Sequence, residues 1–258
     1  MGGFYFSHKY NLLMSRQRFM KLDPEERKID WKMTEDEYYW NFNMYKVKDV
    51  PQKWRLICIQ GYFFVEDQNL TPDIKVKIGV ISRRQYKRGG TRLNARGIDD
   101  EGFVGNFVET ESFYILNNKL CIFTQIRGSI PLFWKQEGLK GIVKFKRDPQ
   151  NTVGVFKKHF NYCKEKYGQI LMINLLKEKS EREQLLSINV KLLFDSNKDI
   201  KGVTYFHYDF HQQGIKNLRK IMEGSDKFID SIGYYSENLE TQTVLTNQNG
   251  VVRTNCMD

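Results

Sequence analysis

The sequence has few of the residues that stabilise small secreted or metal-dependent proteins. It contains four cysteines in 258 residues, and no two of them form a Cys-x-x-Cys pair or stand with histidines at metal-ligand spacing. A disulfide framework and a zinc site are therefore not expected. The wide spacing fits a reducing, cytosolic environment. The four cysteines are Cys58, Cys121, Cys163 and Cys256.

Targeting and membrane signals are also missing. The longest apolar stretch, Leu56–Val65, is interrupted by Gln60 and Gly61 and is far shorter than the roughly 20 residues that a membrane span needs. The segment Met1–Ser7 has neither the basic start nor the apolar centre of a signal peptide. No zinc finger or RNP sequence is present, so nucleic-acid binding is the least supported function.

What the sequence does contain is aromatic residues and positive charge. Aromatic residues make up 14% and hydrophobic residues 40% of the chain, which predicts a folded globular protein. The formal net charge is +10. A surplus of this size suggests an anionic partner, namely a nucleic acid, an acidic membrane or a phosphorylated substrate, although a solvated Lys-rich surface fits equally well.

Two patterns of secondary structure follow one another along the chain. Residues 8–50 are polar and aromatic and are expected to be helical in part. From Trp54 to about Lys146 the pattern is that of strands, rich in Val, Ile, Phe and Tyr and separated by Gly, Asn and Asp. The predicted strands are Arg55–Val65, Ile74–Ser82, Phe103–Thr110 and Leu120–Gln125.

From Asn151 onward, helical and strand patterns alternate. Apolar residues at helical spacing end at Gly168, a plausible C-terminal stop, and Ser180 begins another helix with a capping-box spacing to Glu183. Alternation of this kind predicts an α/β fold with a mixed, largely parallel sheet and flanking helices, preceded by a β-rich portion. The predicted elements are a helix over 153–167, strand Ile170–Leu176, a helix over 181–193, strand Val203–Phe210, a helix over 215–222, and a hairpin of Thr243–Thr246 with Val251–Thr254 around Asn249-Gly250.

The chain closes on a β-run that leads directly into Cys256. In cysteine-phosphatase chemistry the Cys follows a strand, and an Arg six positions later begins a helix. The backbone N–H groups between them hold the phosphate and favour the thiolate. The Arg grips two phosphate oxygens. Taken alone, a single Cys is more often a buried small hydrophobe.

Several ordered blocks of sequence favour the catalytic interpretation. The tail Val252–Asp258, read Val-Arg-Thr-Asn-Cys-Met-Asp, is similar to the start of the catalytic motif of Sac-family phosphoinositide phosphatases. The resemblance covers nearly the whole chain. The local sequence of the matching blocks is most similar to the Sac-one-like branch rather than to the synaptojanin-type branch. The other matching blocks, in order, are Gly3–Ser7, Ser82–Arg84, Gly90–Arg92, Arg96–Asp99, Gly105–Glu111, Gln125–Trp134 and Phe206–His211.

The resemblance implies a function and a mechanism. The enzyme would remove a phosphate monoester from a phosphatidylinositol monophosphate such as phosphatidylinositol 4-phosphate. Cys256 would be the nucleophile of a cysteinyl-phosphate intermediate, and Asp258 an alternative proton donor to the leaving group. Neither a metal nor another cofactor is needed. The expected partners are phosphoinositide lipids and an anionic membrane surface, at the cytoplasmic face of endoplasmic-reticulum or Golgi-type membranes.

The resemblance also implies that the chain is a part of the family's domain. Residues 1–50 would be the end of the N-terminal subdomain and residues 51–258 an incomplete, cysteine-phosphatase-like catalytic subdomain, because the last residue falls before the motif's Arg. We therefore expect this polypeptide by itself to be inactive. The alternative function is a non-catalytic module that binds phosphoinositides or anionic membranes.

A basic cluster is the second candidate site. Six basic residues with no acid among them fall within fourteen positions, and they form either a solvated loop or a cationic wall that guides anionic lipid to the active site, where each contributes about 1 kcal/mol. These residues are Arg83, Arg84, Lys87, Arg88, Arg92 and Arg96. Arg127 is a separate phosphate-binding candidate, with a structural ion pair to Glu109 or Glu111 as the alternative.

Further candidates lie at strand ends. Arg253 and Asn255, just before the cysteine, are expected to bind phosphate. Asp209 and His211 follow a predicted strand, where α/β sheets place their sites. They are either acid–base groups or structural hydrogen-bonding residues. The remaining histidines, including His159, are expected to be core or surface residues.

Overall fold

The computed structural model describes residues 2–27, 37–46, 51, 54–91, 94–137 and 141–255. These residues form two compact units that interleave along the chain. The first unit takes Met1–Lys87, Val108–Thr124 and Tyr234–Gln248, and the second takes Arg88–Phe107, Gln125–Gly233 and Asn249–Asp258. The boundary expected at residue 50 stays a prediction, since residues 47–50, 52 and 53 lie outside the described residues.

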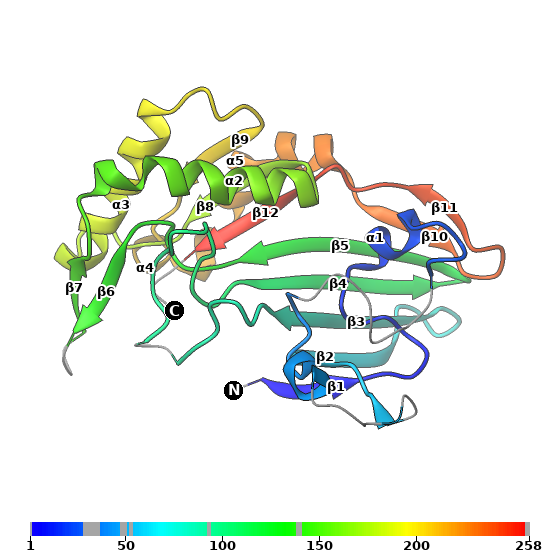
Figure 1. Ribbon diagram of the computed structural model, residues 1–258. Coiled ribbons are helices and arrows are strands. Elements are labelled where there is room, and N and C mark those ends of the chain that lie inside the picture. Colours follow the sequence, from blue (N-terminus) through cyan, green and yellow to red (C-terminus); the bar gives the residue numbers. More distant parts are fainter. Residues whose placement is uncertain are drawn as a thin grey trace. The chain divides into compact units, whose positions relative to one another are not determined.

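The first unit is built on an antiparallel meander (Figure 1). Strands β1, β2, β3 and β4 pair antiparallel in sequence order, and β5 lies beside β4. The first part of β5 pairs antiparallel with β10, which pairs with β11. The bounds are β1 Gly3–Phe6, β2 Cys58–Asn69, β3 Lys75–Arg84, β4 Val108–Leu116, β5 Lys119–Arg127, β10 Tyr235–Asn238 and β11 Thr243–Thr246, with helix α1 at Arg16–Lys21 and a 3₁₀ turn η1 at Phe42–Lys46.

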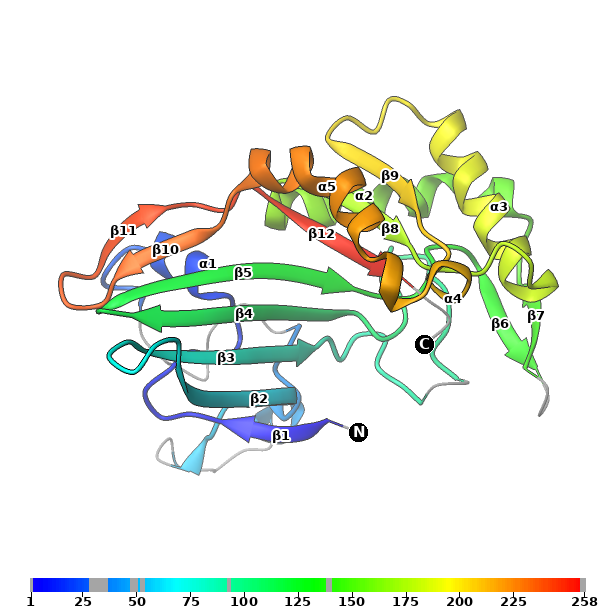
Figure 2. The ribbon, with the colours of Figure 1, turned by 180° about the vertical axis from the view of Figure 1, so that it is seen from behind.

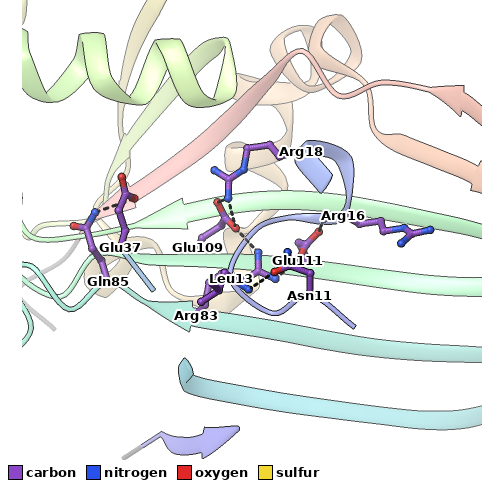
Figure 3. A network of polar contacts seen from close by, with 9 residues as sticks. All are labelled: Asn11, Leu13, Arg16, Arg18, Glu37, Arg83, Gln85, Glu109 and Glu111. Atoms are coloured by element: carbon purple, nitrogen blue, oxygen red, sulfur yellow. Dashed lines mark hydrogen bonds and ion pairs between the residues drawn. The ribbon is translucent and has the colours of Figure 1, made fainter. Parts of the chain in front are cut away.

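A buried ion network lies on this meander (Figure 3). Arg83 is 0% exposed and donates to a carboxylate oxygen of Glu109 and, at 2.6 Å, to Oε2 of Glu111. Burial alone would lower the pKa of Arg83, but the carboxylates of Glu111 and Glu109 raise it above its ordinary value. Arg18 from α1 also contacts Glu109, and the backbone N–H of Arg16 bonds Glu111. The network therefore joins α1 to β3 and β4.

The second unit contains the parallel part of the sheet (Figure 2). The end of β5, Gln125–Arg127, pairs parallel with β12 (Gly250–Asn255), which pairs parallel with β8 (Gln169–Asn174). Strand β8 pairs parallel with β9 (Val203–His207). Strands β6 (Trp134–Glu137) and β7 (Ile142–Phe145) form a separate antiparallel pair. Strand β12, at the end of the described residues, thus lies between two strands, β5 and β8, that come much earlier in the sequence.

Helices cover both faces of this parallel part (Figures 1 and 2). Helices α2 (Val153–Tyr167) and α3 (Glu181–Ser196) pack through Phe156, Phe160 and Phe194, and α5 (Arg219–Ile232) lies on the other face. The core side chains of α2, α3 and β8 form one apolar cluster. The short elements are η3 (Pro149–Thr152), α4 (Phe210–Gln213) and η4 (Ile215–Asn217).

Most of the predicted elements are confirmed, with one error of pairing. The α/β class, the parallel strands and the flanking helices are as expected. Helix α2 ends before Gly168, whose φ of 86° lies in the left-handed region that glycine favours. The predicted hairpin of β11 with β12 is wrong, because β11 pairs with β10, while β12 enters the sheet between β5 and β8.

Several element boundaries and one cap also differ from the prediction. The strand expected at Val203–Phe210 ends at His207, because Asp209 caps helix α4 at Phe210. The helix expected over 215–222 is a 3₁₀ turn at Ile215–Asn217 followed by α5 from Arg219. The strand expected at Phe103–Thr110 begins at Val108 and runs to Leu116. Helix α3 begins after Ser180 as expected, but no capping bond forms. Glu183 instead accepts a hydrogen bond from the backbone of Lys177 at 2.9 Å. Within the described part of the chain, no helix has both the length and the apolar character needed to span a bilayer.

The ion network predicts a strong dependence of stability on Arg83. Replacing it in Arg83→Met leaves two buried carboxylates without their main partner, so the free energy of unfolding should fall by roughly 3–5 kcal/mol. Lys75→Met, on an exposed position of the same strand, should change it by less than about 0.5 kcal/mol. Denaturant unfolding of both variants measures this, and equal small effects would contradict a structural role for the network.

Candidate active site

The candidate site lies where β12, β8 and β9 end at the same edge of the second unit. Parallel strands bring their carboxyl ends together, and α/β folds bind ligands there. Strand β12 ends at Asn255, and Cys256 is the next residue of the chain. Cys256 and Asp258 lie outside the described residues, so their roles stay predictions.

A small cavity of about 40 Å³ opens beside this strand end. It is lined by Asn106, Arg127, Gly128, Ser129, Leu175, Thr254 and Asn255. Arg127, the last residue of β5, is exposed, and its guanidinium has no ion-pair or hydrogen-bond partner among the described residues. The alternative of an ion pair with Glu109 or Glu111 is not realised, because these carboxylates pair with Arg83. Arg127 is therefore free to bind an anion in the cavity.

Arg253 is buried next to two residues that line the cavity. It is 0% exposed, and its Nη2 donates to the Ser129 carbonyl at 2.9 Å while its Nε donates to Nε2 of His159 at 3.1 Å. Its Nη1 lies 3.5 Å from Oδ1 of Asn255. Burial lowers the pKa of Arg253 to about 10, so it still carries its charge at neutral pH. Arg253 is not among the residues that line the cavity, but it bonds two that do, Ser129 and Asn255.

His159 accepts the Arg253 hydrogen bond as a neutral imidazole. It is buried in α2, and its Nδ1 lies 2.9 Å from the Gly102 carbonyl, which assigns the proton to Nδ1 and the lone pair to Nε2. Burial and the adjacent Arg253 charge lower the pKa of His159 well below its ordinary value of 6.5. His159 is therefore a core residue, one of the two placements expected from the sequence.

Asn255 is held in the wall of the cavity by a second buried amide. Its Nδ2 donates to Oδ1 of Asn174 at 2.8 Å. Asn174 in turn donates to the hydroxyls of Ser187 and Tyr205, at 2.8 and 2.9 Å. This network fixes the rotamer of Asn255, and therefore where its amide can meet a bound anion.

Asp209 serves as a helix cap. Its Oδ1 accepts from the backbone of His211 and Gln212, and its Oδ2 accepts from the backbone of Glu178. Burial alone would raise the pKa of Asp209, but these three N–H donors hold it below its ordinary value. These bonds favour the structural interpretation of Asp209. The ring of His211 lies edge-on to Phe210.

The basic cluster requires correction at two of its positions. Arg83 is enclosed by carboxylates, and Arg96 is 2% exposed, with its Nε bonded to Gln136 and its guanidinium over Trp134. Neither can reach a membrane surface. Arg84 lies over the Trp40 ring and bonds Gln60.

The remaining residues of the cluster are divided between the two units. Arg88 bonds the carbonyls of Gly97 and Arg96, which turns its side chain toward its own loop. Arg83, Arg84 and Lys87 belong to the first unit, and Arg88 and Arg96 to the second. Arg92 lies outside the described residues.

Three further residues of the site were not candidates in the sequence analysis, although Asn106 and Ser129 lie within its matching blocks. Asn106 has a φ of 54° and lines the cavity. Ser129 gives its carbonyl to Arg253 and accepts from the Gly97 backbone through Oγ. His159 lies in an apolar helical stripe that indicates only burial. In the described part of the chain, no group of three or more His, Cys, Asp or Glu side chains could hold a metal ion.

Comparisons with known proteins agree with the resemblance. A family model described as "SacI homology domain" matches residues 1–214. Polyphosphatidylinositol phosphatase INP53 of Saccharomyces cerevisiae is 34% identical over 100% of the chain and 25% of its own length. Yeast phosphatidylinositol-3-phosphatase SAC1 is 32% identical over 99% of the chain and 44% of its length, and human synaptojanin-1 is 32% identical over 90% and 15%.

The coverage and the identities each have a consequence for the assignment. The chain spans less than half the length of each of these relatives. SAC1 and synaptojanin-1 match with the same identity, so the assignment to the Sac-one-like branch stays a prediction.

The neutral His159 predicts a loss of stability in acid. The unfolded chain binds a proton at this residue at a higher pH than the folded chain does. Stability is therefore full above about pH 6.5 and falls as the pH drops below it, by up to about 1.4 kcal/mol per pH unit. Unfolding free energies between pH 8 and 5 should show this slope in the wild type and lose it in His159→Gln. The exposed control His8→Gln should keep it, and parallel wild-type and His159→Gln profiles would exclude a buried neutral imidazole.

Proposed function

Because the chain belongs to the SacI homology domain family, we propose that it forms the phosphate-binding part of a phosphoinositide phosphatase. The observation that carries the proposal is the position of Arg127 and Asn255. An unpaired guanidinium and a fixed amide share one cavity at the strand end that leads directly into Cys256. Cation and amide donors are the groups that bind a phosphate monoester dianion.

The chemistry follows from those groups. The Cys256 thiolate attacks phosphorus, and the bond to the inositol oxygen breaks as the cysteinyl-phosphate forms. Asp258 is the proposed donor of a proton to the leaving oxygen. Water then hydrolyses the cysteinyl-phosphate and releases inorganic phosphate and the free thiolate. Arg127 and Asn255 bind the phosphoryl oxygens, and Arg253 holds the Ser129 and Asn255 walls.

The substrate is proposed to be a phosphatidylinositol monophosphate such as phosphatidylinositol 4-phosphate. The sequence blocks nearest to the Sac-one-like branch support this choice, and the small cavity suits one monoester. The lipid lies in an anionic membrane surface. The location at the cytoplasmic face of endoplasmic-reticulum or Golgi-type membranes is part of the same proposal and follows from the resemblance.

The nucleophile is tested in a polypeptide that contains these residues and the complete catalytic motif. Cys256→Ser should abolish phosphate release from phosphatidylinositol 4-phosphate, because a Ser hydroxyl stays protonated where the thiolate attacks. Thermal unfolding should be unchanged, which separates loss of chemistry from loss of fold. Substantial turnover by the Ser variant would exclude this mechanism. Phosphoinositide binding without any turnover in the parent protein would favour the non-catalytic module.

A second expectation concerns residues 1–258 alone. This polypeptide should release no phosphate above a Cys256→Ala control, because it lacks the Arg that the motif places six positions after the Cys. Losing a single preorganised donor costs on the order of a hundredfold to a thousandfold in rate. A malachite-green assay on phosphatidylinositol 4-phosphate vesicles measures it. Release clearly above the control would mean that another residue is the nucleophile.

A further inference from the structure

The segment from Phe210 to Met222 presents an exposed surface that is both apolar and basic, referred to below as the α4–α5 surface. Phe210, Leu218 and Met222 are 37%, 39% and 59% exposed. Lys216, Arg219 and Lys220 are exposed among them, and the segment contains no acidic residue. It comprises α4, η4 and the first turn of α5.

The exposed apolar side chains continue a buried stripe. Along α5, the face that includes Ser225 and Ile232 is buried on the sheet, with Phe228 and Ile229 half-buried. A Cβ at Gly224 would lie 2.7 Å from the Phe206 ring, so the helix is in close contact with β9 at that point. Closer to the start of α5 the same face changes, with Leu218 and Met222 exposed and Ile221 half-buried.

Helix α4, where the surface begins, lies near the end of β12 in the second unit (Figure 2). Asn255 in the cavity wall bonds Asn174, whose backbone carbonyl accepts from the backbone of Tyr208 at 2.9 Å. Asp209, the next residue, caps α4 at Phe210. Two hydrogen bonds and two peptide links therefore join the cavity to the start of the surface.

We propose that the α4–α5 surface binds an anionic lipid bilayer and holds the cavity against it. The proposal deepens the proposed function, on which it rests, by naming the surface through which the membrane is met. Segments with apolar side chains between Lys and Arg bind membrane interfaces through buried apolar area and attraction to anionic lipid. Charge distinguishes this surface from the exposed apolar face of α3, formed by Leu185, Ile188 and Leu192. Helix α3 carries Glu181, Glu183 and Asp195 against Arg182 and Lys191.

The electrostatic part is tested with residues 1–258 and vesicles of phosphatidylcholine and phosphatidylserine, without phosphoinositide. The triple variant Lys216→Gln, Arg219→Gln, Lys220→Gln should lower the partition coefficient on the order of a hundredfold, since each basic residue near the surface contributes about 1 kcal/mol. Binding of the wild type should weaken as salt rises.

A charge-matched control removes the general effect of net charge. The triple variant Lys191→Gln, Lys198→Gln, Lys201→Gln changes three exposed lysines on and after α3, away from the carboxyl ends of the strands. It should bind vesicles within about twofold of the wild type. An equal loss in both triple variants would overturn the proposal in favour of diffuse attraction.

The apolar part needs its own pair of variants. Leu218→Ser with Met222→Ser should weaken vesicle binding roughly tenfold through lost apolar burial. Leu185→Ser with Leu192→Ser on α3 should leave it unchanged. Far-ultraviolet circular dichroism checks that each variant is folded. Vesicle binding as strong as that of the wild type in the Leu218→Ser, Met222→Ser variant would overturn the proposal. The proposal would also be overturned if the protein bound RNA through these residues and did not bind vesicles.

This experiment and the phosphatase assay fail independently. Vesicle binding that depends on the α4–α5 surface, together with a catalytically inert Cys256 in the complete motif, would sustain the surface and refute the proposed function. Turnover of a soluble short-chain phosphoinositide, together with vesicle binding that is unchanged in the α4–α5 surface variants, would sustain the proposed function and refute the role of the surface.

Discussion

The parallel insertion of β12 between β5 and β8 is the constraint on which the candidate site depends. It aligns Arg253 with Ile126 and Asn255 with Asn174, so one strand joins residues that are more than eighty positions apart. Each of these pairings closes a long loop, and the entropy lost in closing it opposes folding until the strand contacts form. The cavity walls at Ser129 and Asn255 therefore exist only when the last strand is in place.

The same strand carries a buried charge, Arg253, that has no carboxylate partner among the described residues. Arg253 donates to a carbonyl, a neutral imidazole and an amide, which accept three of its hydrogen bonds but do not neutralise its charge. Burial of such a group opposes folding, as its lowered pKa indicates. A site that binds a dianion gains from a fixed positive charge close by. We interpret the buried charge of Arg253 as one that lowers the stability of the fold but favours anion binding. Arg83 differs, because its charge is neutralised inside the fold.

The sequence predicts local structure here better than it predicts partners. Gly168 and Ser180 mark helix ends because their effect depends on neighbouring backbone, and the α/β alternation follows from periodicity. The pairing of β12 cannot be predicted from periodicity. Asn249-Gly250 is a hairpin signal whether or not the following strand turns back on the preceding one. Similarly, the run from Arg83 to Arg96 looks like a charged loop. Only the fold shows that Glu109 and Glu111 neutralise Arg83 and that Trp134 covers Arg96.

Residues of the candidate site divide in the same manner. Arg127 and Asn255 stand out from the sequence because they adjoin a strand end and a recognisable motif. Asn106 and His159 do not, because their roles come from a backbone turn and from a hydrogen bond to a strand ninety-four positions away. The α4–α5 surface was equally hidden, since apolar residues at helical spacing predict a core position and only the structure shows Leu218 and Met222 exposed.

The trio of Arg83, Glu109 and Glu111 also limits the routes by which this sequence can diverge. Loss of any one member leaves an uncompensated charge in the interior, whereas joint replacement by apolar residues of similar volume is often neutral or favourable. The three positions are therefore strongly non-additive. A lineage that leaves this arrangement must pass through a destabilised intermediate or change several codons together, so the trio should persist or vanish as a unit.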